Sequence, residues 1–316
     1  MVGMNRWLRS LAVVVALSAS LLPLAIQSLA AQSLADPAGW QRDLEAWRSA
    51  REKQISAPDG WLTLCGMAWL KPGFNALGSD AAAPLRLPAT APARVGLMTV
   101  SGKTVQLLSP AGGFPAGLTI DGQPAREIAL STSDAAPSVI ALGTLNMVVM
   151  ERAGRFVLRV KDSASPARTA FHGLNWYAPN PKLVVLARWT PYTPAKTAEI
   201  PTALGQSLHM TAPGVARFTI GEQEVELEPV VEAPESRSLL FILRDTTSSS
   251  ATYPGGRFLH TQIPDHGLDQ PGTVVLDFNR LENPPCAYTQ FATCPLPQEK
   301  NRLGIGLEAG EKRYQP

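Results

Sequence analysis

The sequence predicts a mainly β protein of two sandwich-like or barrel-like domains with one N-terminal helix. Short apolar runs separated by Gly and Pro turns dominate the chain after residue 95, a pattern typical of all-β architectures. One early segment instead repeats its apolar residues at helical spacing. With 316 residues, 45% of them hydrophobic, the chain is long enough for two cores, because domains usually contain about 100–200 residues.

The charge balance excludes one class of partner. The 28 basic and 26 acidic residues leave a formal net charge of +2. A protein that binds the phosphate backbone needs a strongly basic surface. We therefore expect no nucleic-acid partner.

The first thirty residues have the layout of a secretory signal peptide. Arg6 and Arg9 precede an apolar run over residues 11–29, and the small residues Ser28 and Ala30 follow the pattern of a cleavage site. This predicts a signal peptide at residues 1–30 and export, to the periplasm in a Gram-negative bacterium. An uncleaved anchor is the alternative, because about 18–20 apolar residues can span a bilayer. No later stretch is long enough, so we expect no membrane span after signal removal.

The segment after the signal region predicts the helix. Asp36 followed by Pro37 is a typical helix start, and Trp40, Leu44 and Trp47 then recur on one helical face. We expect a helix over residues 37–54 and group it with the first β domain.

The β runs that follow predict hairpins and one fully covered strand. Ser101-Gly102 and Asp121-Gly122 are suited to two-residue hairpin turns, which require positive φ. The run LLFIL at residues 239–243 is apolar throughout, as expected for a strand buried on both faces.

A Ser-, Ala- and Pro-containing stretch at residues 161–173 interrupts the apolar pattern and predicts the domain boundary. We place the first domain, helix plus sandwich, at residues 36–165 and the second at residues 166–316.

The order of segments in the first domain is similar to that of forkhead-associated sandwiches. The stretch WLKPGFNALGSD at residues 69–80, then strand pairs and LGTLNMVVMERAGRFVLRVKD at residues 142–162, carry this loose resemblance. The resemblance implies a sandwich shape only. That family reads phosphothreonine through an arginine after the turn glycine, whereas Gly78 is followed here by Ser79.

A second, longer resemblance covers nearly the whole chain after the signal region. The motif DFNR-x2-NPPC-x7-C at residues 277–294, with RDTTSSSATYPGGRFL at 244–259 and GWLTLCGMAWLKPGFNALGSD at 60–80, resembles the bacterial and archaeal domain-of-unknown-function family 1684. This family supplies no established activity that the resemblance could transfer.

The motif segments contain the polar residues that we select as candidate ligand-binding residues. These are Tyr253, Arg257, Asp277, Asn279, Arg280, Asn283 and Glu308. Arginine forks are suited to carboxylates and phosphates. The leading hypothesis is a pocket in the C-terminal domain that binds a small anionic molecule or an envelope component.

Two alternatives stay open for these residues. In one, an Asp or Glu acts as general base of a hydrolase, with Arg280 stabilising an oxyanion. In the other, the charges pair with one another and fix the proline-rich loop. The chain contains no G-x-S-x-G, H-E-x-x-H or P-loop motif, and we expect no cofactor.

The cysteines predict a disulfide in the C-terminal motif. Export allows Cys286 and Cys294 to pair, and the intervening residues are numerous enough to turn back. A zinc site with His260 and His266 is the alternative. We otherwise expect no metal site, and we expect Cys65 to be an inert buried thiol.

Overall fold

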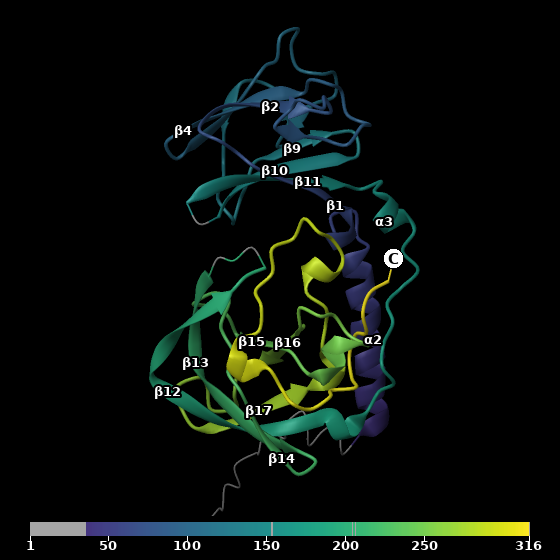
Figure 1. The fold of residues 1–316 in the computed structure, drawn as a ribbon, viewed down its shortest axis with the longest axis vertical. Helices are drawn as coiled ribbons and strands as arrows, with labels where there is room; N and C mark the ends of the chain where they lie inside the picture. The colour runs from purple at the N-terminus through teal and green to yellow at the C-terminus, as the bar shows by residue number, and fades with distance from the viewer. Residues whose placement is uncertain (1–35, 153, 204, 206, 316) are drawn as a thin grey trace, which may run out of the picture.

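The structure is a computed structural model that describes residues 36–152, 154–203, 205 and 207–315 (Figure 1). The predicted signal peptide at residues 1–30 lies outside these residues. The described chain is mainly β with one long helix near its start, as predicted. Within the described residues, no helix is both long and apolar enough to cross a membrane.

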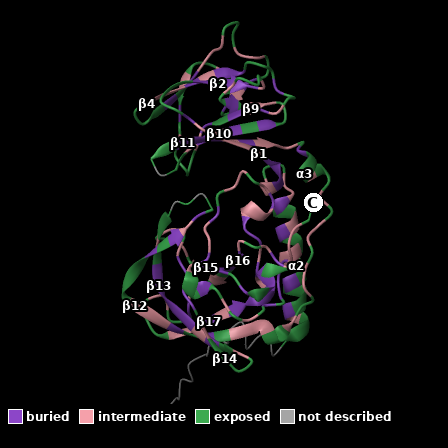
Figure 2. Cartoon of the chain, viewed as in Figure 1, coloured by how far each residue is buried: buried purple, intermediate pink, exposed green. Residues whose placement is uncertain are grey.

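The predicted helix is α2, which runs over Pro37–Ile55. The Asp36 carboxylate accepts a hydrogen bond from the Gly39 backbone N–H at 2.8 Å, and Pro37 occupies the first turn, where its missing N–H costs nothing. Trp40, Leu44 and Ile55 are buried, and buried and exposed residues alternate along the helix (Figure 2). Its start and type are as the capping pattern predicted.

Two sheets form the first sandwich, which we define as residues 64–162. The six-stranded sheet contains, in order, β1 (Leu64–Trp69), β11 (Arg155–Asp162), β10 (Leu145–Arg152), β9 (Val139–Leu142), β6 (Thr119–Ile120) and β7 (Gln123–Pro124). The five-stranded sheet contains β3 (Leu85–Arg86), β2 (Gly73–Gly78), β4 (Gly96–Ser101), β5 (Thr104–Leu108) and β8 (Ile128–Leu130).

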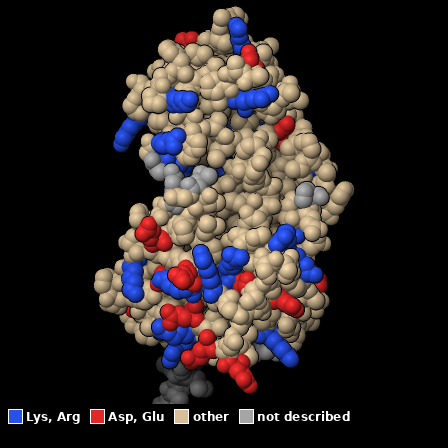
Figure 3. Space-filling model, in the orientation of Figure 1, with Lys and Arg blue, Asp and Glu red and all other residues tan. Residues whose placement is uncertain are grey.

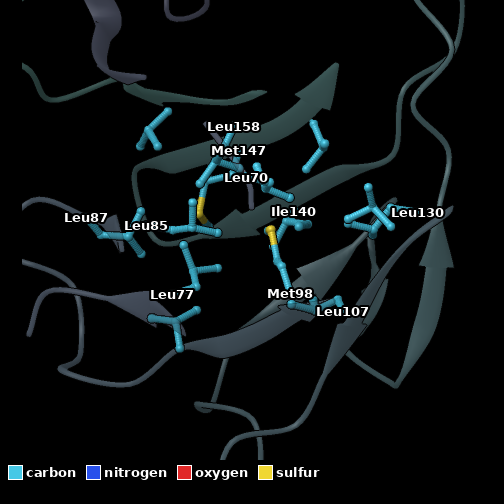
Figure 4. Close-up of a cluster of buried hydrophobic side chains, with 14 of the residues drawn as sticks. Leu70, Leu77, Leu85, Leu87, Met98, Leu107, Leu130, Ile140, Met147 and Leu158 are labelled. Atoms are coloured by element: carbon cyan, nitrogen blue, oxygen red, sulfur yellow. The ribbon is translucent and has the colours of Figure 1, made fainter. Parts of the chain in front are cut away.

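The two sheets enclose one apolar core (Figure 4). Leu77, Met98 and Leu107 approach it from the five-stranded sheet, and Met147 and Leu158 approach it from the other. Because side chains alternate along a strand, the residues between the core positions of β10 and β11 face away from this core. They form the outer face of the six-stranded sheet.

Both predicted hairpin turns occur, one of them shifted by a residue. Asp121 and Gly122 connect β6 and β7 with φ of 52° and 77°, the left-handed conformation that such a turn requires. The turn between β4 and β5 is instead Gly102-Lys103, because Ser101 still pairs with Thr104 in the ladder.

The C-terminal half, which we define as residues 174–315, contains two further sheets. One has the order β14 (Gln223–Leu227), β13 (Ser207–Ile220), β12 (Val184–Pro201) and β17 (Gly272–Asp277). The other pairs β15 (Ser238–Leu243) with β16 (Arg257–Gln262). Residues 239–243 of β15 are all buried, as the apolar run predicted.

Short helical turns complete the described chain. They are η1 (Trp61–Thr63), α3 (Pro166–Thr169), η2 (Pro181–Leu183), η3 (Thr246–Ser249), η4 (Phe278–Arg280), η5 (Pro285–Ala287) and η6 (Glu299–Asn301).

Helix α2 makes its polar contacts with the C-terminal half, although we grouped it with the first sandwich. The Trp40 indole N–H donates to Asp277 at 3.0 Å, and the Arg51 guanidinium donates to Glu311 at 3.0 Å. These buried donors need acceptors, and the acceptors lie more than 230 residues away in sequence, which local patterns do not reveal. The division of the chain at residue 165 stays a prediction.

Candidate functional site

Arg257, the first residue of β16, is fully buried in a network of acceptors. Its Nη2 donates to the Asp245 carboxylate at 2.7 Å and to the Leu307 carbonyl at 2.8 Å. Its Nη1 donates to the carbonyls of Ala309 and Glu311. Both charged side chains have an exposed fraction of 0%. This arginine therefore fastens the C-terminal segment to β16 and does not face solvent.

Asp277 and Asn279 lie where β17 ends and η4 begins. Asp277 accepts hydrogen bonds from the Trp40 indole N–H and from the backbone and side-chain nitrogens of Asn279, at 2.9–3.0 Å. The Asn279 amide also bonds in both directions to the backbone of Asn180, at 2.8 and 2.9 Å. Both side chains are buried, and their bonds connect the end of β17 and the start of η4 to Asn180 and to helix α2.

Asn283 belongs to a second buried network, centred on Glu311. The Glu311 carboxylate accepts from the Asn283 backbone N–H at 2.8 Å, from the Tyr288 hydroxyl at 2.5 Å and from Arg51. Burial raises the pKa of Glu311, and the Arg51 charge and these hydrogen bonds oppose that rise. The Asn283 side chain donates to the Lys312 carbonyl at 2.8 Å. Glu311 is not one of the candidate ligand-binding residues selected from the sequence.

The three remaining candidates have more exposed side chains and different neighbours. The Tyr253 hydroxyl donates to the Cys286 carbonyl at 3.3 Å, and burial raises its pKa. The Arg280 guanidinium pairs with Asp277 at 3.3 Å and lies 5.6 Å from the centre of the Trp47 ring. Glu308 is exposed. The contacts of the motif residues are thus mainly with other parts of the chain, as in the alternative in which the charges pair with one another.

Cys286 and Cys294 form the predicted disulfide, with their Cα atoms 6.1 Å apart. We call residues 286–294 the disulfide loop. The Thr289 hydroxyl donates to the Leu64 carbonyl at 2.8 Å, so the loop is fixed to the first residue of β1. In Figure 1 this yellow loop lies below β1, β10 and β11.

The histidines of the zinc alternative have other partners. The His260 ring lies between Glu232, at 3.5 Å, and Glu282, at 3.3 Å. Hydrogen bonds to Glu232 and then Glu282 raise the pKa of His260 to about 9. The His266 Nδ1 atom lies 3.0 Å from the Pro271 carbonyl. Because both sulfur atoms are in the disulfide, the zinc alternative at these cysteines is not realised.

Cys65, which we expected to be buried, is only half-buried. Its thiol donates to the Val160 carbonyl at 3.5 Å, and burial raises the pKa of this thiol to about 11.

A cavity of about 250 Å³ lies where the first sandwich meets the C-terminal half. We call it the junction cavity. The outline in Figure 3 is indented on the left, between the two parts. The walls of the junction cavity come from η1, from the outer face of β1, β10 and β11, from Thr202 after β12 and the start of β13, and from the disulfide loop. The lining residues are Trp61, Met67, Trp69, Arg152, Val157, Arg159, Thr202, Ser207, Leu208, Phe291 and Thr293.

Arg159 is a partly buried arginine that lines the junction cavity. Its guanidinium lies 5.3 Å from the centre of the Trp61 ring, and its Nη1 lies 3.7 Å from the Met150 sulfur. In the described part of the chain, no carboxylate is within ion-pair distance of it. Burial lowers the pKa of Arg159, Arg152 lowers it further, and Asp134 raises it. An arginine nevertheless stays charged at neutral pH.

Aromatic and apolar groups supply most of the remaining wall. Trp61, Trp69 and Phe291 provide ring surface, and Thr202, Ser207 and Thr293 provide hydroxyl groups. None of the described lining residues is Asp, Glu, His or Cys. Such a wall fits an anion with an apolar body, since arginine pairs with the charged group and rings cover the remainder.

Another cavity, of about 460 Å³, lies in the first sandwich between residues 90–92, 116–117 and 142–145. It is larger than the junction cavity, but its lining contains no charged side chain and no aromatic ring. A specific ligand site usually combines apolar surface with a few polar groups that fix orientation. The junction cavity has that combination and is therefore our candidate site.

The protein is thus mainly β, with a site lined by arginine and tryptophan between the first sandwich and the C-terminal half. A family model described as "Protein of unknown function (DUF1684)" matches residues 169–312, and the chain belongs to this family. A solution NMR structure of an uncharacterized protein from Haloarcula marismortui is 31% identical. That similarity covers 46% of this chain and 78% of the other, with a TM-score of 0.40. Among curated proteins, no match was found.

Proposed function

We propose that the protein binds a small anionic ligand with an apolar or aromatic body in the junction cavity. The observation that carries this proposal is the Arg159 guanidinium, which lines the cavity next to Trp61 without a carboxylate partner among the described residues.

The energetic argument concerns desolvation. Arg159 is partly buried, which lowers its pKa, and its protein contacts are a ring face and a thioether sulfur. A partly buried charge without a partner is costly. A bound carboxylate, sulfonate or phosphate would supply the missing acceptor through charge-assisted hydrogen bonds.

Binding is better supported than hydrolysis. General-base catalysis requires a titratable group within hydrogen-bond reach of the reacting atoms. The described cavity lining contains no carboxylate or imidazole, and Asp277 is occupied by donors from Trp40 and Asn279. The carboxylate-based hydrolase is therefore the weaker alternative.

The signal-like first thirty residues support a proposal about where the protein acts. We propose that the protein is exported, to the periplasm in a Gram-negative host, and meets its ligand there as a free small molecule or as part of an envelope component. N-terminal sequencing of the protein from its host tests this part of the proposal, which an intact Met1 on cytosolic protein would end.

The binding proposal is tested with two probes of similar size, benzoate and the neutral benzyl alcohol. We expect saturable binding of benzoate, at least about tenfold tighter than that of benzyl alcohol, because a hydrogen bond to a charged group contributes about 1.5–3 kcal/mol. NMR titration that follows the indole N–H signals of Trp61 and Trp69 measures both affinities.

Arg159→Gln and Arg155→Gln form a matched pair of variants. Both residues lie on the outer face of β11, but only Arg159 lines the junction cavity, whereas the Arg155 guanidinium lies 4.5 Å from the centre of the Trp69 ring. We expect Arg159→Gln to weaken benzoate binding about tenfold and Arg155→Gln to weaken it less than about twofold. Equal losses in the two variants, or equal binding of the two probes, would refute the proposal.

A further inference from the structure

The junction cavity contains a second arginine whose charge is already compensated. Arg152, the last residue of β10, lines the cavity. Its Nη1 donates to both carboxylate oxygens of Asp134, at 2.9 and 3.0 Å, and to the Glu151 carbonyl at 2.7 Å. Arg152 therefore presents to the cavity a guanidinium paired with a carboxylate.

The loop that presents Asp134 is closed at its base. The Ser138 backbone N–H donates to the Ser131 carbonyl at 2.9 Å, and the Ser131 backbone N–H donates to the Ser138 hydroxyl oxygen at 3.1 Å. The Ser131 hydroxyl also donates to the Ala136 carbonyl at 2.7 Å. These bonds fix the ends of the loop and place the Asp134 carboxylate beside the arginine.

Arg159, Arg152 and Asp134 together leave one net positive charge at the junction cavity. Arg159 contributes one positive charge, and Arg152 with Asp134 contributes none. Asp134 also acts electrostatically on Arg159, where it raises the pKa and partly offsets the larger opposing effect of Arg152. A ligand with one negative charge is matched by this arrangement. A second negative charge on the ligand would lack a free cation and would be repelled by Asp134.

We propose that Asp134 is a specificity-determining residue that restricts the junction cavity to singly charged anions. This inference rests on the proposed function and adds the charge class of the ligand. Asp134 acts in two ways, because it accepts from the Nη1 atom of Arg152 and adds negative charge beside the cavity.

The test compares benzoate with phenyl phosphate, which has the same ring and carries two negative charges at pH ~8, above the second phosphate pKa of about 6. We expect the native protein to bind benzoate more tightly. In Asp134→Asn, the ratio of phenyl phosphate to benzoate affinity rises by up to about fivefold, the upper end of the effect expected for an exposed charge pair. The same NMR titration measures both ligands.

Glu127→Gln is the matched control. It removes one negative charge from the first sandwich, but the Glu127 carboxylate accepts from the Ser109 backbone N–H and is not paired with an arginine of the cavity. We expect its affinity ratio to equal that of the native protein. An unchanged ratio in Asp134→Asn, or an equal change in Glu127→Gln, would overturn the role of Asp134 and leave Arg159-dependent benzoate binding intact. If benzoate does not bind the native protein at all, the proposed function fails and this inference fails with it.

Discussion

The C-terminal motif and the junction cavity both contain a buried or partly buried arginine, but the two arginines differ in whether a carboxylate pairs with them. Arg257 in the motif has no exposed surface and pairs with Asp245 and several carbonyls. Arg159 in the cavity contacts a ring and a sulfur atom, and no carboxylate of the described chain pairs with it. A dense cluster of charged residues in sequence can thus mark the internal framework, whereas sparser arginines on a strand face can mark the surface available to a ligand.

The largest effect that tests this comparison is expected at Arg257. Replacing Arg257 by Met should lower the free energy of unfolding by about 3–5 kcal/mol, because it leaves the Asp245 carboxylate buried without its cation. Urea unfolding measures the loss. Whatever fraction stays folded should bind benzoate with native affinity.

Arg280→Ala is the contrast within the same motif. Its side chain is 24% exposed, so removing the pair with Asp277 should cost about 1 kcal/mol or less. Benzoate affinity should again be unchanged, since Arg280 does not line the junction cavity. A stable Arg280→Ala protein that no longer binds benzoate would return the site to the motif, as the sequence hypothesis had it.

The disulfide belongs to both regions, and its loss should affect both stability and binding. In the chain-entropy picture, closing the short disulfide loop contributes about 2.5 kcal/mol. The loop also supplies Phe291 and Thr293 to the junction cavity. We expect reduction with dithiothreitol to lower the unfolding free energy by about this amount and to weaken benzoate binding.

The same reduction experiment on a Cys65→Ala variant separates the effect of breaking the disulfide from any reaction of the Cys65 thiol. Cys65 is half-buried on β1, and its removal leaves the Cys286–Cys294 bridge in place. If reduced protein in this background keeps native benzoate affinity, the disulfide loop does not shape the cavity.

Local sequence patterns predicted much of the fold. The Asp36-Pro37 start gave the helix, the Asp121-Gly122 pair gave a turn, and the apolar run at 239–243 gave a buried strand. The Cys286–Cys294 bridge was also predicted, from the short spacing and from the export that the first thirty residues led us to expect. Each of these features depends on neighbours within about ten residues or on a short loop.

The candidate site was not predictable in the same way. The wall of the junction cavity combines Trp61 and Arg159 with Phe291, which local reasoning cannot bring together. One signal was present: Arg155, Arg159 and Lys161 alternate with core residues on β11, so three cations share the outer face. The sheet face of a solvent-exposed strand shows the same alternation of cations and core residues. Only the position of the C-terminal half, which packs against this face, distinguishes a cavity wall from an exposed face.

An effect of about the same size as that at Arg280 is expected at His260, which belongs to the internally paired charges. Hydrogen bonds to Glu232 and Glu282 raise its pKa from 6.5 to about 9. A pKa raised by folding means that protonated His260 stabilises the folded state fully below pH ~6.5. This stabilisation is lost as the pH rises through about 9. Because the side chain is 41% exposed, we expect a loss of about 1 kcal/mol across this range after solvent screening.

Urea unfolding at several pH values measures this loss, with His260→Gln and His266→Gln as a pair. The first variant should remove the decline in stability, and the second should retain it, because the His266 ring contacts a backbone carbonyl and not a carboxylate. Benzoate affinity in the native protein should stay constant over the same range, since His260 does not line the junction cavity and Arg159 remains charged. A binding constant that falls together with stability would show that the internal network and the cavity are coupled, which contradicts the separation of roles inferred from Arg257 and Arg159.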